Sequence, residues 1–287
     1  MDILFLIRSR RDQLRGNSAK VAETILDDVG FAASASIDQL ATRAGVSKAA
    51  LSRFAKRVDC ADLRELRLRL ARASAVGSRF LDAAPVMARA PRFFGQIVGD
   101  IERSLHQHLA GFDEARISTA VDLIVSAQKI YAFGMGGCST LLAGEVQYRL
   151  VRLGYPVAAY HDPVLMRIAA ATLGPQDLLI LLSITGVTPE LLAIARLARS
   201  YGTHLLAITR VDSPLAETAD VLLPIVLDET DFIYKPTAAR YGMLLAIDLL
   251  ATETALRAPD TSKELLRRVK LALDDYRDGE DRLPLGD

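Results

Sequence analysis

Cysteine is scarce in this sequence. Its 287 residues include only Cys60 and Cys138, and neither lies in a Cys/His spacing typical of a metal site. Two cysteines cannot form the framework of a disulfide-stabilised fold, and such sparse use is typical of a reducing compartment. We therefore expect a cytoplasmic protein, and we predict neither a metal nor a cofactor.

Long uncharged hydrophobic runs are also missing. The first residues, MDILFLIRSRRDQLR, place a short apolar run ahead of a basic cluster, which is the reverse of the order in a signal peptide. No later run reaches the length of a membrane span without a charge, glycine or proline, so we expect no membrane contact. Hydrophobic residues nevertheless make up 51% of the chain and charged residues 24%, which predicts a folded core rather than disorder.

The net charge of zero conceals two regions of opposite sign. Residues 1–80 contain 15 Lys and Arg against 9 Asp and Glu, a charge of +6. The rest of the chain contains 20 against 26, a charge of −6. A basic N-terminal region and an acidic remainder indicate two modules with different partners. A solvated basic helix surface would give the same charge count.

Residues 17–72 have the periodicity of helices. Within them Ser36 and Gln39 form a capping-box pattern, Gly45 provides the left-handed turn that ends a helix, and Ser47 is placed to cap the next one. The region 37–58 is therefore predicted to be a helix-turn-helix unit, whose second helix can enter the major groove of DNA.

The second helix of this unit turns small and basic side chains outward. Small residues near its start allow close approach to base edges, and the basic residues suit bases or phosphates. The predicted DNA-binding residues are Arg43, Ser47, Lys48, Ala49, Ser52, Arg53 and Lys56. A plain three-helix bundle with a wet basic face is the alternative. The turn, the cap and the local positive charge together favour a domain that binds double-stranded DNA.

A different pattern begins at residue 96. Two helices are expected before residue 127, and five short aliphatic runs follow: KIYAFG, YPVAAY, DLLILLSI, HLLAITR and DVLLPIV. Helical segments separate the runs, and a last helix at 238–256 precedes a charged tail. Strands buried on both faces that alternate with helices predict a doubly wound parallel sheet. The predicted fold class is α/β, with an all-α helix-turn-helix domain at 1–75, a linker at 76–95 and a sheet domain at 96–287.

Glycines and hydroxyl side chains follow two of the predicted strands. The first loop, in IYAFGMGGCSTLLAGE, contains three glycines, and the second is SITGVTPE. Ligands of open parallel sheets bind beyond the carboxyl ends of the strands, where backbone N–H groups and hydroxyls can hold an anion such as phosphate without a lysine. The predicted ligand-binding residues are Gly136, Gly137, Cys138, Ser139, Ser183, Thr185, Gly186 and Thr188. For Thr188, and for Ser213 in a later loop, plain helix capping is the alternative.

With these motifs the chain resembles RpiR-type transcriptional regulators, which join an N-terminal helix-turn-helix to a C-terminal SIS (sugar isomerase) domain. LATRAGVSKAALSRFAKRV is similar to the recognition unit of the family, and GMGGCS, SITGVTPE and ITRVDSPLAETAD are similar to its sugar-phosphate loops, in order. The resemblance implies a regulator that binds a phosphosugar or a related anionic metabolite and changes its DNA occupancy in response. Cys138 stands where the family usually has serine, with Ser139 next to it, and Thr185 replaces a second usual serine.

A sugar-phosphate isomerase, or a bifunctional enzyme, built on the same loops is the alternative function. Such an enzyme needs a general base near the ligand. The candidates are Glu145, His161, Asp162, Glu190, His204 and Glu229. No two of them have a recognisable catalytic spacing, so we expect a regulator without catalytic residues.

Assembly follows from the size of the recognition unit. One recognition helix reads only a few base pairs, so a specific regulator needs at least two. Closed symmetric assemblies supply them most simply. We therefore expect a homodimer or a homotetramer.

Overall fold

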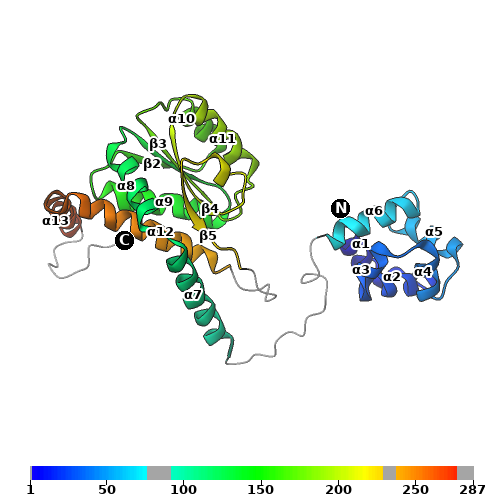
Figure 1. Ribbon diagram of the computed structural model, residues 1–287. Helices are drawn as coiled ribbons and strands as arrows, with labels where there is room; N and C mark the ends of the chain where they lie inside the picture. Colours follow the sequence, from blue (N-terminus) through cyan, green and yellow to red (C-terminus); the bar gives the residue numbers. More distant parts are fainter. Residues whose placement is uncertain (1, 76–91, 229–236, 277–287) are drawn as a thin grey trace. The chain divides into compact units, whose positions relative to one another are not determined.

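The computed structural model describes residues 2–75, 92–228 and 237–276, which form two compact units. The first unit is entirely helical within residues 2–75, and the second contains the sheet (Figure 1). The α/β fold class predicted from the sequence is confirmed. Most of the predicted linker at 76–95 lies outside the described residues, and from Arg92 onward the chain is already helical.

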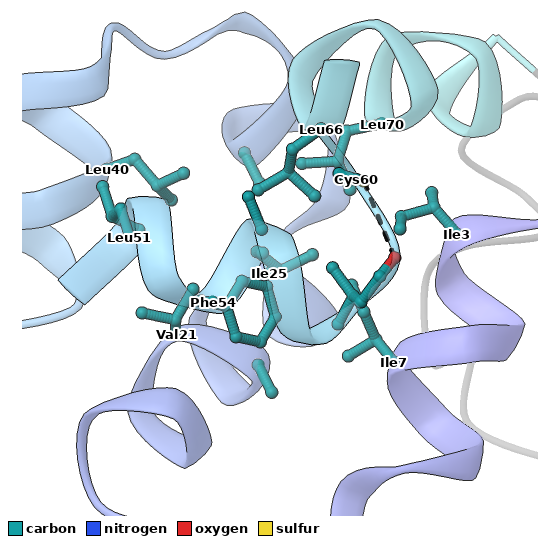
Figure 2. Packing of buried hydrophobic residues seen from close by; sticks show 14 of the residues in the cluster. Ile3, Ile7, Val21, Ile25, Leu40, Leu51, Phe54, Cys60, Leu66 and Leu70 are labelled. Carbon is teal, nitrogen blue, oxygen red and sulfur yellow. Dashed lines mark hydrogen bonds between the residues drawn. The ribbon is translucent and has the colours of Figure 1, made fainter. Parts of the chain in front are cut away.

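The N-terminal unit consists of short helices around one apolar core. They are α1 (Ile3–Ser9), α2 (Asn17–Asp27), α3 (Val29–Ser34), α4 (Ile37–Arg43), α5 (Lys48–Arg57) and α6 (Leu63–Ser74), with a single 3₁₀ turn at Arg11–Gln13. Figure 2 shows Phe54 of α5 at the centre of this core, between side chains from α1, α2 and α6. Phe54, Leu51, Ile25 and Leu66 have no exposed surface at all. Burying each such side chain stabilises the unit by about 1.5–3 kcal/mol.

Two helices of this unit were not expected from the sequence. The first apolar run forms α1, whose Ile3 and Ile7 point into the core (Figure 2). Within the helical region expected from residue 17, α2 stops at Asp27, because Asp28 starts the separate helix α3 by accepting a hydrogen bond from the Phe31 N–H at 2.8 Å. Burial of the thiol among apolar side chains raises the pKa of Cys60 and leaves it a core residue.

The second unit is built on a five-stranded parallel sheet. The strands are β1 (Ile130–Gly134), β2 (Val157–Tyr160), β3 (Leu178–Ser183), β4 (His204–Arg210) and β5 (Val221–Ile225), in the order β2-β1-β3-β4-β5. Helices α8 (Glu114–Ser126), α9 (Gly137–Val151) and α12 (Ala239–Arg257) pack on one face, and α10 (Pro163–Ala170) and α11 (Pro189–Ser200) on the other. All five strands were predicted, because each lies in a short, mostly apolar run, and β3 is buried along its whole length.

The remaining helices differ from the expectation at three places. Helix α7 (Arg92–Gly111) begins four residues earlier than predicted and packs against α12 and β5. The helical segment expected between the fourth and fifth aliphatic runs is only a 3₁₀ turn, Ala216–Thr218. The charged tail forms helix α13 (Pro259–Tyr276), which continues from α12 with one face of its 18 residues partly buried.

The strand order decides where loops can meet. The chain moves from β1 to β2 on one side, and then crosses back to place β3 on the other side of β1. Such a reversal leaves a crevice between the loops that follow the two strands, and in open α/β sheets this crevice is where ligands bind. Here the two loops are those after β1 and β3.

Candidate functional sites

The turn between α4 and α5 has the geometry of a helix-turn-helix. The Ser36 hydroxyl accepts from the Gln39 N–H at 3.2 Å, and the Gln39 side chain accepts from the Ser36 N–H at 2.8 Å, which confirms the predicted capping box. Gly45 has a φ of +62°, the left-handed conformation that glycine adopts without strain. The Ser47 hydroxyl then accepts from the Ala50 N–H at 3.2 Å and starts α5. These caps fix the angle at which α5 leaves the turn.

Helix α5 presents its predicted DNA-binding residues to solvent. Its inner face is buried in the core, so the opposite face is the one open to a partner. The exposed residues on that face are Ser47, Lys48, Ala49, Ser52, Arg53 and Lys56. Arg53 and Lys56 have no ion-pair partner among the described residues, whereas Lys48 lies 2.5 Å from Asp38 in an exposed pair. Exposed pairs contribute little, so all three cations are available to phosphates.

Arg43 is held more firmly than the sequence suggests. Its guanidinium donates to the Asp28 carboxylate at 3.0 Å and lies over the Phe31 ring, 4.2 Å from the ring centre. The Phe31 N–H and, after it, the Arg43 side chain lower the pKa of the Asp28 carboxyl below its usual range. A phosphate contact by Arg43 therefore competes with this internal pair.

Sequence reasoning also missed Arg10, which fastens the end of α5. Its side chain donates to the Arg57 carbonyl oxygen at 2.5 Å and to both oxygens of Asp59 at 3.0 and 2.6 Å. A cation at the last carbonyls of a helix also interacts favourably with the helix dipole. Arg10 thus helps to set the orientation of the recognition helix without facing outward.

In the sheet unit, the loop after β1 brings the start of α9 very close to the strand. A Cβ atom at Gly134 would lie 2.0 Å from the Ser139 carbonyl oxygen, so only glycine fits there. Gly136 has a φ of +83° and stands at the N-cap of α9, where it offers no side chain to cap the helix. The first N–H groups of α9 therefore face the loop without a side-chain acceptor among the described residues, as in an anion site.

The hydroxyls near this loop are not equivalent. The Thr140 hydroxyl donates to the Gly134 carbonyl oxygen at 3.1 Å, so it holds the start of α9 to the end of β1. Ser139 is buried, with 6% of its surface exposed, and Cys138 is half-buried beside it. Burial raises the pKa of the Cys138 thiol, so the thiol stays protonated at neutral pH.

The loop after β3 is held by a different set of contacts. The Ser183 hydroxyl accepts from the Gly186 N–H at 3.0 Å, and Gly186 has a φ of +67°. A Cβ at Gly186 would lie 2.2 Å from the Ser213 hydroxyl and 2.7 Å from the Thr209 hydroxyl. Thr209 is fully buried and its hydroxyl has no partner among the described residues. The loop therefore packs closely on the ends of β3 and β4.

The two threonines of this loop and Ser213 take different roles. Thr185 is exposed, and Thr188 precedes α11 without a side-chain cap, so the capping alternative for Thr188 does not hold. Ser213 accepts from the Ala216 N–H at 3.2 Å and donates to the Arg210 carbonyl oxygen at 2.7 Å. Ser213 therefore stabilises its own turn, which is the kind of local role that the capping alternative gives it.

A cation that the sequence reasoning overlooked lies near the first loop. Arg240, the second residue of α12, donates to the Tyr241 hydroxyl at 3.0 Å and has no ion-pair partner among the described residues. Its positive charge lowers the pKa of the Cys138 thiol, against the larger effect of burial, and α12, which carries Arg240, packs against α9. An arginine in the first turn of a helix opposes the helix dipole. That unfavourable position was the signal available in the sequence.

Most general-base candidates are occupied or remote. Glu145 pairs with Arg149 at 2.5 Å, Glu190 pairs with Arg167 at 2.7 Å, and Asp162 caps α10 by accepting from the Leu165 N–H at 2.7 Å. His204 is the first residue of β4, so it lies at the amino ends of the strands, whereas the two loops follow their carboxyl ends. His161 is exposed after β2, and Glu229 lies outside the described residues. Within the described ranges there is also no group of His, Cys, Asp and Glu that could hold a metal, and no helix long and apolar enough to cross a bilayer.

Comparison with known proteins agrees with this architecture. The family model described as a helix-turn-helix domain of the rpiR family matches residues 1–77, and the SIS domain model matches residues 123–253. Over 277 residues the chain is 34% identical to the HTH-type transcriptional regulator HexR of Pseudomonas aeruginosa, and the match covers 95% of each chain. It is 31% identical to HexR of Escherichia coli over 292 residues, which cover 100% of this chain and 99% of the relative.

A solved structure shows the same combination of units. The Vibrio vulnificus NanR protein, complexed with ManNAc-6P, matches with a TM-score of 0.59 at 20% identity, over 94% of this chain and 98% of that one. At this identity the likeness shows a shared fold. The two HexR matches, each above 30% identity and nearly full length, also show the family to which the chain belongs. The chain belongs to the family of HTH-type transcriptional regulators that join an rpiR-type helix-turn-helix to a SIS domain.

Proposed function

We propose that this regulator binds a phosphosugar or a similar anionic metabolite in its SIS domain and that the metabolite changes its affinity for operator DNA. The observation that carries the proposal is the uncapped start of α9 at the reversal of strand order. Free N–H groups and the positive end of the helix dipole favour an anion at that point. The NanR structure, whose fold is shared, holds a phosphosugar, ManNAc-6P.

The anion would be held between the loops after β1 and β3. On the first loop the N–H groups of Gly137, Cys138 and Ser139 supply donors, with Gly136 leaving room for close approach. On the second loop Thr185 and Thr188 offer hydroxyls that make no hydrogen bond to described residues, and Ser183 and Gly186 hold the loop in shape. Arg240 would supply the positive charge, since it is the cation near the first loop that carries no internal ion pair.

DNA would be held by the exposed face of α5. Arg53 and Ser52 are placed to reach base edges, and Lys48 and Lys56 to reach phosphates. We expect the active form to be a cytoplasmic homodimer or homotetramer, because a single recognition helix covers one half-site.

A regulator accounts for the sheet site better than an isomerase does. Glu145 and Glu190 each pair with an arginine and Asp162 caps α10, so each already has a structural role, and no two candidates show a recognisable catalytic spacing. Turnover of any sugar phosphate by the purified chain would reverse this preference.

The proposal is tested in two steps. Phosphosugars and small anionic metabolites are first screened for a rise in the unfolding midpoint of the full chain, since a ligand of the native state stabilises it. The best one is then titrated against the chain bound to its own promoter DNA, followed by fluorescence anisotropy. A ligand should shift the DNA equilibrium by its differential affinity for the free and DNA-bound forms. If no anion raises the midpoint, or if the best one leaves DNA binding unchanged, the sensing role is wrong.

A further inference from the structure

The arginines that hydrogen-bond within the N-terminal unit fall into two groups. In the first group each guanidinium is paired with a carboxylate, and the pairs are Arg10–Asp59, Arg43–Asp28 and Arg69–Glu65. Arg57, the last residue of α5, belongs to the second group. Its guanidinium donates to the Ser18 hydroxyl at 3.1 Å and has no ion-pair partner among the described residues. The positive charge of Arg57 is therefore held in place but not compensated.

The bond to Ser18 places Arg57 at the start of α2. Ser18 lies in the first turn of α2 and is 8% exposed, and α2 packs against α5. Arg15, two positions before the first residue of α2, is exposed and donates only to a neutral group, the Leu14 carbonyl oxygen, at 3.2 Å. The first turn of α2 contains no acidic residue. Two uncompensated cations thus lie at the junction of α2 and α5.

A solvated arginine that serves only solubility needs no fixed position. Ordering a long side chain costs rotamer entropy, and here no carboxylate of the described chain repays that cost through an ion pair. An arginine that is already ordered loses less freedom when it binds an anion, because its planar guanidinium is held in position beforehand. The arrangement of Arg57 therefore favours an external anion as its partner.

Arg57 also lies on the exposed face of α5. It follows Arg53 by four residues, so the two side chains leave the helix about 40° apart. Both are exposed, whereas Phe54 on the other side of α5 fills the core (Figure 2). The face that is expected to bind DNA therefore continues past Arg53 to the end of α5, and from there to the start of α2.

The position of Arg57 along the helix favours a phosphate over a base. In a helix-turn-helix the N-terminal residues of the recognition helix contact base edges. Arg57 lies about 14 Å beyond Lys48 along the helix axis, and the major groove is about 12 Å wide. A helix that begins at the base edges therefore brings its last residue to the border of the groove, where the phosphates lie.

We propose that the start of α2, through Arg57 and Arg15, is a second DNA contact that binds the phosphate backbone beside the groove occupied by α5. The inference rests on the DNA binding of the proposed function and adds a contact beyond the residues that read bases. Phosphates are the same in every sequence, so this contact raises affinity without selecting a sequence. It also helps to fix the orientation of α5 in the groove, because Arg57 is hydrogen-bonded to α2.

The test is fluorescence anisotropy of the full chain with two duplexes over a series of salt concentrations. One duplex is the chain's own promoter region, and the other is a random sequence of the same length. Each phosphate contact contributes about 0.9 to the slope of log affinity against log salt. Arg57→Gln keeps an amide donor for Ser18 but removes the charge, so it should lower the slope by about one for each bound N-terminal unit, on both duplexes alike. The double variant with Arg15→Gln should lower it by about two.

The matched control is Arg72→Gln, the same loss of charge at an exposed arginine of α6. Helix α6 packs on the core side of α5, where Figure 2 shows its Leu66 and Leu70, and so lies away from the exposed face of α5. Arg72→Gln should keep the wild-type slope on both duplexes. Arg57→Lys retains the charge and should keep that slope as well.

Two results would overturn the second contact. One is a double variant with the wild-type slope, and the other is an Arg72→Gln variant whose slope falls as far as that of Arg57→Gln, which would mean that net charge matters and position does not. Because the replaced side chains are exposed, circular dichroism should show unchanged helix content in each variant. A wild-type chain that binds neither duplex would refute the proposed function itself, so the two failures are distinguishable.

Discussion

Replacing Gly134 by alanine tests how closely the first turn of α9 lies on the end of β1. The new Cβ would lie 2.0 Å from the carbonyl oxygen and 2.4 Å from the carbonyl carbon of Ser139. Both are backbone atoms, so the turn of the helix has to move as a whole. Overpacking of a close-packed site costs about 1–3 kcal/mol, occasionally more. We expect the upper end of that range, about 3 kcal/mol, in the free energy of unfolding of the sheet unit.

The neighbouring glycines supply matched controls. A Cβ at Gly136 or at Gly137 would meet nothing within 4 Å. Gly136→Ala keeps only the strain of a φ of +83°, which costs an L residue about 1–2 kcal/mol. Gly137→Ala has neither problem and begins a helix, so it should be neutral or stabilise by up to about 1 kcal/mol. The loss of unfolding free energy should therefore be largest for Gly134→Ala, which makes the closest contacts. It should be smaller for Gly136→Ala, which has only the unfavourable φ, and absent for Gly137→Ala.

The assay is urea unfolding of the full chain followed by circular dichroism, since the sequence has no tryptophan to report by fluorescence. Differences between variants are taken from shifts of the midpoint at constant slope. The N-terminal unit acts as an internal reference, because none of the three substitutions lies in it. If Gly134→Ala and Gly137→Ala unfold at the same urea concentration, the close approach of α9 to β1 does not hold this loop and the reasoning is wrong.

Three further predictions concern binding and pH. In anisotropy titrations over a salt series, Arg53→Ala should weaken specific DNA binding by about 1–3 kcal/mol. Lys56→Ala should weaken binding to all DNA sequences alike and lower the slope of log affinity against log salt by about one. If Arg53→Ala weakens binding to random DNA equally, Arg53 does not contact a base. Calorimetry of Arg240→Gln with the best anion should show a ten- to hundredfold loss of affinity, about 1.5–3 kcal/mol, and unchanged affinity would place the anion elsewhere. The pKa of Asp28 is lower in the folded chain than its ordinary value of 3.8, so its contribution to stability is present above that value and is lost as pH falls through the folded pKa. Asp28→Asn should therefore lower the melting temperature at neutral pH and flatten its decline in acid, and parallel curves for the two chains would contradict this.

The sheet could be predicted because its signal is local. Each strand lies in a short, mostly apolar run, and each loop after β1 and β3 combines glycine with hydroxyls within a few residues. The capping box of α4 and the turn at Gly45 are local in the same sense, since all their hydrogen bonds join residues three to five positions apart. Patterns of this length can be recognised in the sequence without knowledge of any distant contact.

The features that escaped prediction depend on distant residues. Helix α1 has only seven residues, too few for a periodic pattern, and it is helical because its apolar side chains fill the core of the N-terminal unit. Helix α13 reads as a charged tail because much of its length is exposed. Arg240 comes close to Cys138 from a position about 100 residues later in the chain, and no local pattern reports that approach.

The separation of the cores has a consequence for the order in which this chain folds. The core of the N-terminal unit is made entirely of residues between Ile3 and Ala73, and the cores on the two faces of the sheet begin only at Ala120. Domains fold as units during synthesis, and at about 5–20 residues per second the ribosome needs roughly 10–40 s to add the last 200 or so residues. The helix-turn-helix unit can therefore be folded while the SIS domain is still being synthesised. During that interval the nascent chain carries a folded helix-turn-helix without a folded SIS domain to control it.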